Sequence, residues 1–185
     1  MKIITMDYIN SGIVDDIRRG RIFVYPTDTI YGIGCNALDD DAVKRVFAAK
    51  RRDESAALSV IAPSFEWIVR NCDVDMDVVR KYLPGPYTLI VKKKDAGFLF
   101  RVSAGRDTLG VRIIDHPVMK FFEMAGVPFV TTSVNASGNE PVSDVSMIPK
   151  EILRYVDVVI DDGIISGKPS KIVDLSDGKV KIVRG

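Results

Sequence analysis

The sequence predicts an α/β protein of the α+β type, with one mixed sheet of parallel and antiparallel strands flanked by helices. Apolar residues recur in some segments with a period of two, which is typical of strands, and in others with a period near 3.6, which is typical of helices. No internal repeat, low-complexity tract or linker rich in Pro, Gly and Ser divides the 185 residues, a length that suits one core. We therefore expect a single domain over residues 1–185.

Short segments rich in β-branched residues are predicted as strands. In chain order they are Lys2–Thr5, Arg21–Tyr25, Leu58–Ala62, Tyr87–Lys92, Gly110–Ile113, Pro128–Thr132, Val156–Ile160, Ser170–Leu175 and Lys179–Val183. The dipeptide Asp177-Gly178 lies between the last two segments and is a strong signal for a β-hairpin. The sheet is therefore expected to contain antiparallel pairs.

Segments with helical spacing separate these strands. They are Asp7–Arg19, Asp40–Lys50, Ser64–Asn71, Asp75–Tyr82, His116–Ala125 and Pro149–Tyr155. In the first of them, Ile9, Ile13 and Ile17 recur at i+4 and place one apolar stripe on the helix. Asp39 to Asp41 supply cap and first-turn carboxylates at the start of the second helix, and Lys50 to Arg52 close it, an order that complements the helix dipole.

Composition excludes several classes of protein. Lys and Arg number 26 against 25 acidic residues, so no global field draws the chain to nucleic acid or anionic lipid, and any basic surface must be local. Cys35 and Cys72 lie far apart, outside any CxxC cluster, which excludes a structural zinc site; we expect two buried free thiols, with a disulfide as the alternative. Neither a secretory signal nor a run of about 18 apolar residues occurs, so we expect a cytoplasmic protein with no membrane association.

Three polar segments follow predicted strands, where open α/β sheets place their ligands. Pro26–Gly34 holds hydroxyls, Asp28 and two glycines, and its alternative interpretation is a plain Asx or ST turn. Thr131–Gly138 offers hydroxyls and an amide that can orient a polar ligand, and its alternative is an ordinary loop. Gly167–Lys171 is the third such segment. Their recurrence at strand ends favours a ligand pocket.

Basic residues gather at the end of the second helix, where Lys50-x-Arg52 suits an anionic ligand because Arg grips phosphate oxygens bidentately and Lys supplies a point charge. The alternative is a solvated helix end that satisfies the dipole. Lys92 to Lys94 are interpreted as solvated lysines at a strand end. The chain has neither a P-loop nor a Gly-x-Gly-x-x-Gly motif after a strand, so a nucleotide site here would be of another design.

Arg112 stands inside an apolar strand, and a buried arginine must be paired or must face a ligand. Asp115 is the nearest candidate partner. His116, the only histidine, precedes a proline at a predicted helix start, so we expect a cap or packing residue rather than a base. One histidine in that setting supports no Ser/His/Asp triad.

In their order, these segments resemble the YrdC-like family of threonylcarbamoyl-adenylate synthases, which act in tRNA modification. The resemblance runs from about Arg21 to Arg184, and five or six ordered motifs rarely coincide by chance. The motifs are Pro-Thr-(Asp/Glu)-Thr-x-Tyr-Gly-Leu at Pro26–Ile33, Lys-x-Arg at Lys50 and Arg52, Pro-Gly-Pro-x-Thr-Leu at Pro84–Leu89, Gly-Val-Arg-x-x-Asp-His-Pro at Gly110–Pro117, Ser-x-Asn-x-Ser-Gly at Ser133–Gly138, and the late Pro169, Ser170 and Arg184.

The resemblance implies a twisted mixed sheet with a concave, positively lined cavity. There a nucleotidyltransferase would combine L-threonine, bicarbonate or CO₂ and Mg-ATP into threonylcarbamoyl-AMP and pyrophosphate, and transferase machinery downstream would use the product to make N6-threonylcarbamoyladenosine (t6A) in tRNA. Mg²⁺ would bind chiefly through the phosphates, with no metal ligand in the protein. By matching position, threonine would contact Thr29, Arg112 and Ser170, and ATP would contact Lys50, Arg52, Thr108, Ser133, Asn135, Ser143 and Arg184. The implied catalytic group is Lys50, Arg52, Ser133 and Asn135, and Asp28 is a helper without an assigned role.

The chain departs from the family pattern mainly at the threonine end. Where the family has Pro-Leu-x-Val-His, this sequence reads Ala57 to Ile61 and so lacks the proline and the histidine; Lys171 replaces the threonine of Pro-Ser-Thr, and Thr132 the proline of Pro-Ser-x-Asn. These changes point to a shifted substrate pocket beside intact nucleotide-side Lys/Arg and Ser/Asn elements. The length resembles that of the short, single-domain members.

Two other functions remain open at this stage. The first is a non-catalytic module that binds double-stranded RNA or tRNA; near-zero net charge and the absence of a basic stripe interleaved with aromatics make it secondary. The second is carbamoyl transfer in metal-centre maturation, which a homologous domain of larger hydrogenase-maturation proteins suggests. The absence of acylphosphatase-like and zinc-finger portions argues against it.

Overall fold

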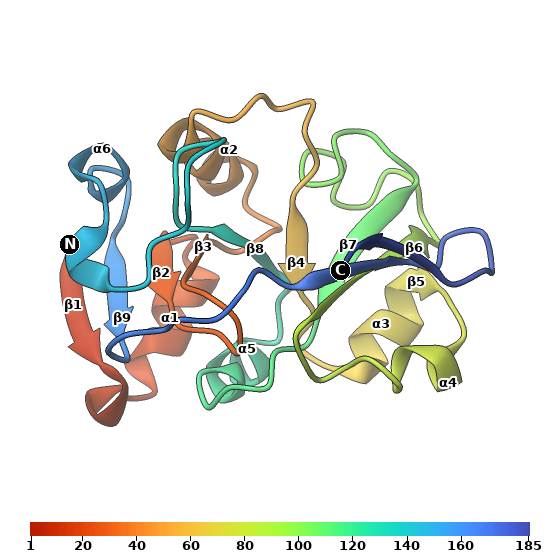
Figure 1. The fold of residues 1–185 in the computed structure, drawn as a ribbon, viewed down its shortest axis with the longest axis horizontal. Coiled ribbons are helices and arrows are strands. Elements are labelled where there is room, and N and C mark those ends of the chain that lie inside the picture. Colours follow the sequence, from red (N-terminus) through yellow and green to blue (C-terminus); the bar gives the residue numbers. More distant parts are fainter.

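Eleven strands form one mixed sheet in a computed structural model that describes all 185 residues (Figure 1). They are β1 (Lys2–Thr5), β2 (Phe23–Tyr25), β3 (Gly32–Gly34), β4 (Ser59–Ile61), β5 (Cys72–Asp73), β6 (Tyr87–Lys93), β7 (Thr108–Arg112), β8 (Phe129–Ser133), β9 (Val158–Asp161), β10 (Lys171–Asp174) and β11 (Lys181–Arg184). The order across the sheet is β1-β9-β2-β3-β8-β4-β7-β6-β10-β11, and β5 pairs with β6 outside this path.

The sheet contains both parallel and antiparallel pairs, as predicted. β9 pairs in parallel with both β1 and β2, as do β4 with β7 and β6 with β10. The other neighbours are antiparallel, including the hairpin of β10 and β11. Gly178 takes a φ of 75° in the hairpin turn, a left-handed conformation that glycine adopts without steric cost. The hairpin predicted from Asp177-Gly178 is therefore confirmed.

The helices lie in two groups around the sheet (Figure 1). They are α1 (Gly12–Arg18), α2 (Asp40–Lys50), α3 (Phe65–Asn71), α4 (Met76–Val79), α5 (Met119–Ala125) and α6 (Lys150–Leu153), with 3-10 turns η1 (Met6–Tyr8) and η2 (Val145–Met147). α2 and α6 contact each other at the top of the view, and α1 contacts α5 below, with α3 and α4 at the lower right. Between sheet and helices, 48 buried hydrophobic residues form one continuous core.

The predicted first helix, Asp7–Arg19, is wrong in its first part. The chain forms the 3-10 turn η1 there, and α1 begins only at Gly12. Asn10 accepts a hydrogen bond from the Gly12 amide at 3.0 Å, a local side-chain to backbone bond that favours a turn over a continuous helix. The apolar stripe survives in part, because Ile13 and Ile17 are buried and Ile9 packs against the core.

Two strands, β3 and β5, were not predicted. β3 consists of Gly32, Ile33 and Gly34 and so lacks the β-branched run that marks a strand. A Cβ added to Gly34 would lie 1.6 Å from the carbonyl oxygen of Val130 on β8. Glycine is therefore required by the close approach of the neighbouring strand, which the local sequence does not reveal.

The expectation that Lys92 to Lys94 are all solvated is wrong for Lys93, which is buried. Its Nζ donates to the carbonyl oxygens of Ala96 and Phe98 at 2.7 and 2.8 Å and to Ser103 Oγ at 2.9 Å. Three acceptors satisfy the three N–H groups of an ammonium, which makes the burial tolerable. Lys93 thus fixes the loop that connects β6 to β7.

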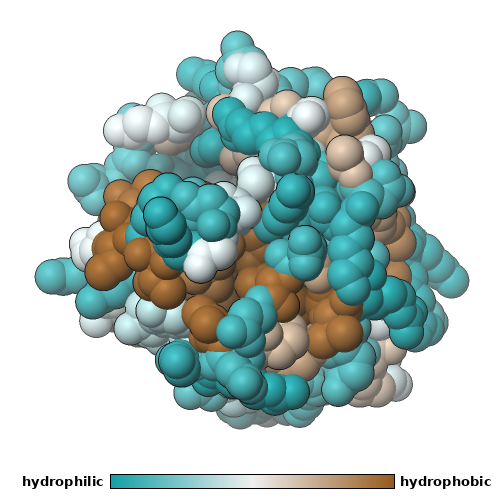
Figure 2. Space-filling model, turned by 90° about the vertical axis from the view of Figure 1, so that its right-hand side faces the viewer, coloured by the Kyte–Doolittle hydropathy of each residue, from teal (hydrophilic) through white to brown (hydrophobic).

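Three further features bear on the predictions from composition. Cys35 and Cys72 are buried free thiols, as expected. None of the helices has the length and the apolar character needed to cross a lipid bilayer. The outermost strand β11 is exposed throughout, with Ile182 and Val183 on the surface; Figure 2 shows the side of the molecule that faces right in Figure 1, where apolar and polar side chains are intermixed.

Candidate functional site

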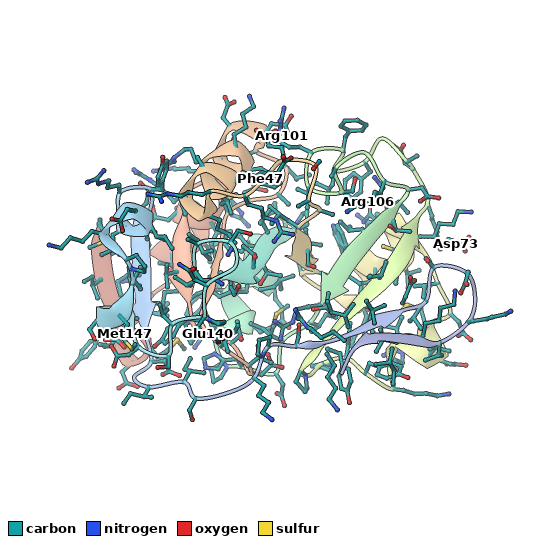
Figure 3. The ribbon with its side chains drawn as sticks, turned by 45° about the horizontal axis from the view of Figure 1, so that its top comes forward. Phe47, Asp73, Arg101, Arg106, Glu140 and Met147 are labelled. Carbon is teal, nitrogen blue, oxygen red and sulfur yellow. The ribbon has the colours of Figure 1, made fainter.

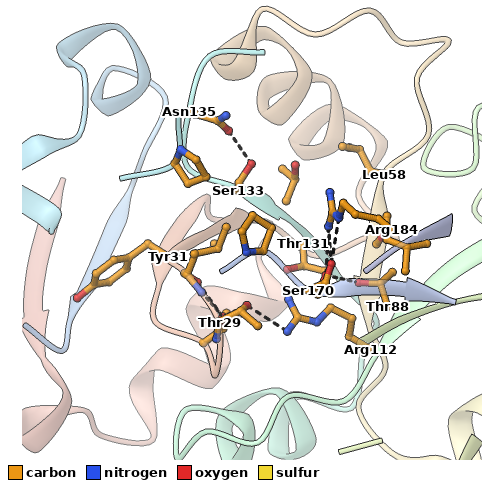
Figure 4. A pocket seen from close by; sticks show the side chains of 18 of the residues that line it. Thr29, Tyr31, Leu58, Thr88, Arg112, Thr131, Ser133, Asn135, Ser170 and Arg184 are labelled. Atoms are coloured by element: carbon orange, nitrogen blue, oxygen red, sulfur yellow. Dashed lines mark hydrogen bonds between the residues drawn. The ribbon is translucent and has the colours of Figure 1, made fainter. Parts of the chain in front are cut away.

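A cavity of about 470 Å³ opens over the middle of the sheet (Figure 4). Only 5 of its 22 lining residues are hydrophobic, so it is suited to a polar ligand. The walls come from the β2–β3 loop, the segment after α2, strands β4, β6, β7, β8 and β11, and the segment that leads into β10. Segments distant in the sequence therefore share one hollow.

Seven of the ten predicted site residues line this cavity. They are Thr29, Arg52, Arg112, Ser133, Asn135, Ser170 and Arg184. The polar segments at the strand ends do converge, which supports a ligand pocket over a set of unrelated turns.

Lys50 lies beside the cavity rather than in its wall. Its buried Nζ donates to the carbonyl oxygen of Ser133 and, at 3.0 and 2.8 Å, to the carbonyl and side-chain oxygens of Asn135. Burial, and next the positive charge of Arg52, lower the pKa of Lys50 to about 7. Lys50 therefore fixes the loop that carries Ser133 and Asn135.

Thr108 and Ser143 do not line the cavity. Thr108 is the first residue of β7 and lies opposite Lys92. The cavity meets β7 only at Arg112, the last residue of the strand. The hydroxyl of Ser143 is 3.7 Å from the sulfur of Met147, and its carbonyl accepts from the Ile165 amide. The structure does not bring these two residues together with the others.

Arg52 is placed by the turn that ends α2. Arg51 adopts a left-handed φ of 48° there, and the Arg52 amide donates to the Phe47 carbonyl, an arrangement typical of helix C-termini. Arg52 Nε and Nη2 donate to the carbonyls of Ala56 and Ala57 at 3.2 and 2.8 Å. Nη1 is left without a protein partner at the cavity wall, available to an anion.

The loop from β6 to β7 supports this segment from outside (Figure 3). The Val102 carbonyl accepts from the Leu58 amide at 2.8 Å, and Arg106 donates to the Ser55 carbonyl at 3.4 Å. Arg101 pairs with Glu54. Burial and the nearby charge of Arg106 both lower the pKa of Arg52, because each disfavours its cation. An anion bound here would relieve that repulsion.

Arg112 pairs with Asp28 and not with Asp115, which corrects the sequence-based expectation. Nη2 donates to Asp28 Oδ1 at 2.8 Å and to Thr29 Oγ1 at 3.3 Å, and both partners of the ion pair are more than nine-tenths buried. Asp115 instead donates its backbone amide to Asp28 Oδ2. The Nε of Arg112 is buried without a partner, and Nη1 makes no hydrogen bond within the protein, so this residue of the cavity wall retains an unused donor at Nη1.

Ser170 lies at the opposite wall, where the hydroxyl of one residue and the guanidinium of another hold it. Its Oγ lies 2.8 Å from Thr88 Oγ1, and its carbonyl accepts from Arg184 Nε and Nη2 at 3.1 and 2.7 Å. These bonds bring β6, β10 and β11 together at the cavity, and they leave Arg184 Nη1 free of protein contacts.

Several lining residues were not predicted as site residues individually, among them Thr27, Thr88, Thr131 and Glu140, although Thr27 and Thr131 lie within the polar segments Pro26–Gly34 and Thr131–Gly138. Thr88 stands as a hydroxyl within an apolar strand, a signal that could have identified it. Thr27 forms the turn around Thr29, since its Oγ1 accepts from the Thr29 and Ile30 amides. Glu140 (Figure 3) is the only lining carboxylate, against three lining arginines, and no local pattern marks it.

Known proteins resemble this chain in sequence and in fold. The Sua5/YciO/YrdC family model, described as "Telomere recombination", matches residues 15–185. A Methanocaldococcus jannaschii protein, which is provisionally named a threonylcarbamoyl-AMP synthase, is 38% identical over 173 residues, which are 91% of this chain and 81% of that protein.

Two solved structures share the fold. The crystal structure of Pyrococcus abyssi Sua5 complexed with L-threonine superposes with a TM-score of 0.88 at 28% identity and covers all of this chain. This chain spans 57% of that longer protein. The crystal structure of Escherichia coli YciO has a TM-score of 0.85 at 26% identity and covers 99% of this chain and 93% of YciO.

Proposed function

The chain belongs to the Sua5/YciO/YrdC family, and we propose that it is a threonylcarbamoyl-AMP synthase. It joins L-threonine, bicarbonate or CO₂ and ATP into threonylcarbamoyl-AMP with release of pyrophosphate, as a nucleotidyltransferase that supplies the t6A modification of tRNA. The M. jannaschii relative bears this activity in its name, and the P. abyssi relative was crystallised with L-threonine. The assignment to this chain rests on the site described above.

One observation carries the proposal: the cavity joins unpaired guanidinium donors with a row of neutral hydroxyls. Arg52 and Arg184 each retain a free Nη1, and neither is paired with a carboxylate. The hydroxyls of Thr29, Thr88 and Ser170 lie together near Arg112. Guanidinium groups suit phosphates, and hydroxyls beside a partly used arginine suit a small polar carboxylate such as an amino acid.

At the threonine end, we assign the amino-acid carboxylate to Arg112, whose Nη1 makes no hydrogen bond within the protein and which lines the cavity. Asp28 holds the other side of this guanidinium, so its donors are fixed before the substrate arrives. Thr29 and Ser170 then orient the amino acid. The amine of threonine and bicarbonate form a carbamate with release of water; with CO₂ the amine gives up a proton instead. An oxygen of this carbamate attacks the α-phosphorus of ATP, and the bond from that phosphorus to the leaving pyrophosphate breaks.

At the nucleotide end, transfer at phosphorus depends mainly on positioning and on positive charge. Arg52 Nη1, which has no protein partner, donates to the phosphate oxygens. Ser133 donates to Asn135 Oδ1 at 2.6 Å, and Asn135 donates to the Asn139 carbonyl, so this loop is rigid before ATP binds. Lys50 supports this loop from outside the cavity through its hydrogen bonds to Ser133 and Asn135.

Mg²⁺ accompanies ATP in this proposal. Nowhere in the chain do three or more His, Cys, Asp or Glu side chains lie close enough together to hold a metal ion. Glu140 is the one carboxylate on the wall. A donor set this poor fits a metal held mainly by phosphate oxygens and water, which is how Mg²⁺ commonly binds with nucleotides. The ion would neutralise phosphate charge that the arginines leave uncompensated.

The test measures pyrophosphate release from Mg-ATP with L-threonine and bicarbonate supplied together or omitted singly. We expect release to require both. Arg52→Ala should lower kcat/KM by roughly ten- to a hundredfold, as removal of one cationic transition-state contact usually does. Lys44→Ala, an exposed position on α2, is the control and should keep the wild-type rate. Release that continues without threonine would refute the substrate assignment.

A further inference from the structure

The segment of residues 162–170, here called the strap, connects β9 to β10 and crosses the molecule to do so (Figure 1). β9 lies between β1 and β2, whereas β10 lies between β6 and β11 at the other end of the sheet. The strap has no regular secondary structure. From residue 164 to residue 169 its only hydrogen bond joins the Ile165 amide to the Ser143 carbonyl. Its position therefore depends on its anchors.

The strap forms part of the cavity wall on the side of Thr29. Gly167 approaches so closely that a Cβ there would lie 1.9 Å from the Thr29 carbonyl oxygen. Pro169 and Ser170 line the cavity directly. By contrast, Arg52, Ser133 and Asn135 reach the cavity from α2 and β8, which the strap does not carry. A displaced strap would disturb the hydroxyl end and, through Ser170, the position of Arg184, but it would leave Arg52 in place.

The start of the strap is anchored by two side chains. Tyr31 Oη accepts from the Asp162 amide at 2.9 Å and donates to the Gly163 carbonyl at 2.8 Å. His116 Nε2 lies 3.0 Å from Asp162 Oδ2. The Val118 amide donates to His116 Nδ1 at 3.2 Å, so the ring proton is on Nε2 and His116 donates to Asp162. The ring is 13% exposed and the Asp162 side chain 38%.

The position of His116 links the strap to the arginine at the threonine end. Arg112 and His116 belong to one short stretch that leaves β7, and Asp115 between them donates its amide to the Asp28 carboxylate that holds Arg112. His116 uses one ring nitrogen to close its own turn and the other to reach across to Asp162. The pair with Asp162 is its only hydrogen bond outside that turn.

We propose that His116 is a positioning residue: through Asp162 it holds the strap against the cavity and so shapes the pocket for the amino-acid substrate. The substrate part of this inference rests on the proposed function, whereas the anchoring part does not. His116 touches neither substrate nor reacting atoms, and it acts through Asp162, Gly167 and Ser170.

Two variants separate this role from a general effect on folding. In His116→Asn the shorter side chain can still accept from the Val118 amide, as asparagine does in turns, but it cannot reach Asp162. Asp162→Ala removes the same contact from an exposed position and leaves the amide bond to Tyr31 in place. Asp41→Ala, which breaks an exposed ion pair with Lys44 on α2, is the matched control.

Amide hydrogen exchange of the free protein tests the anchoring. We expect the amides of Asp162, Gly163 and Ile165 to exchange about five- to tenfold faster in both variants, as loss of one charge-assisted hydrogen bond allows. The double variant should be no faster than either single one, and β4 and β7 should keep their protection. Wild-type exchange in both variants, or multiplied effects in the double one, would overturn the proposal.

Steady-state kinetics test the consequence. The KM for L-threonine should rise about five- to tenfold in both variants, while the KM for ATP should rise less, because the strap reaches Arg184 through Ser170 but does not hold Arg52. Faster exchange with an unchanged threonine KM, or an equal rise for both substrates, would overturn the positioning role. Should the wild-type protein show no threonine-dependent reaction, the proposed function fails, and exchange alone decides whether His116 anchors the strap.

Discussion

Asp28 and Arg112 illustrate how a single buried pair serves both stability and the site. Arg112 brings a positive charge into a strand whose other side chains are mostly buried, and burial lowers its pKa while Asp28 opposes that shift. The ion pair is almost inaccessible to solvent, so each charge depends on the other for compensation. The same pairing uses Nη2 and leaves Nη1 of Arg112 free for a ligand.

Asp28→Asn should therefore destabilise the protein. Asn retains an acceptor for Arg112 but removes the compensating charge, and we expect the free energy of unfolding to fall by about 2 kcal/mol in urea titrations. Asp41→Asn weakens the exposed pair with Lys44 and should change stability by less than about 0.5 kcal/mol. Equal effects of the two variants would contradict the importance of the buried pair.

Lys50 should make the free energy of unfolding depend on pH. Its pKa of about 7 in the folded protein lies below the usual 10.5 of the unfolded chain. Between these values the unfolded state binds more protons, so Lys50 makes stability rise as pH increases from about 7 to about 10.5. Below pH 7 both states are protonated and the Lys50 contribution is constant.

The measurement is the free energy of unfolding from pH 6 to 10 for wild type, Lys50→Met and Lys44→Met. Subtracting the Lys50→Met curve from the wild-type curve removes the titration of Cys35 and Tyr25, whose pKa values burial raises. The difference should increase with pH in the stated window. Lys44→Met should run parallel to wild type, and a flat difference for Lys50→Met would refute the shift.

At the scale of the element, glycines of two kinds shape the sheet. Gly34 in β3 is needed because a Cβ would collide with the Val130 carbonyl, whereas Gly178 in the β10–β11 turn has open space around it and only a left-handed φ. The same substitution to alanine thus tests a steric contact in one place and a backbone preference in the other.

Gly178→Ala should cost about 1 kcal/mol of stability, the usual penalty of a left-handed alanine. Gly34→Ala should cost more than about 3 kcal/mol or prevent folding, because β3 and β8 must separate. Thermal unfolding followed by circular dichroism gives both values. Similar losses for the two variants would show that β3 and β8 do not approach as closely as described.

Elements whose signals are local could be predicted from the sequence. α2 begins and ends at the predicted residues because the Asp39 side chain caps it at Asp41 and Ala42, and Arg51 closes it. β3 could not be predicted, because Gly34 is required by the close approach of Val130 on β8, about 100 residues away. α1 was predicted too long, because one Asn10 to Gly12 bond outweighs an apolar stripe.

The site follows the same rule. Arg52, Ser133 and Asn135 carry recognisable motifs and do line the cavity. The partner of Arg112 could not be identified, because Asp28 lies 84 residues away while Asp115 is near at hand. Glu140 had no pattern to mark it. Residue types at a site can be inferred from a sequence. Partners that are distant in the sequence and meet only in the fold can be identified only from the three-dimensional structure.

At the scale of the whole molecule, the cavity draws its walls from strands across most of the sheet, so a ligand there should stabilise the entire fold. Mg-ATP at about a hundred times its Kd should add about 2.7 kcal/mol, which for a protein of this size raises Tm by roughly 5–10 °C.

Differential scanning fluorimetry measures this shift. Arg52→Ala should lose most of it at the same ATP concentration, and Lys44→Ala should retain it. We expect a single unfolding transition that moves as a whole, because one core joins all the elements. Two transitions, of which ATP moves only one, would contradict this picture.

Ser170 and Arg184, which complete one wall of the cavity, reach it with the hairpin of β10 and β11. Strands β2, β3, β4, β7 and β8, which carry much of the remaining wall, pair with one another without that hairpin. A chain in which the hairpin has separated from β6 would therefore carry an open trough in place of a closed pocket.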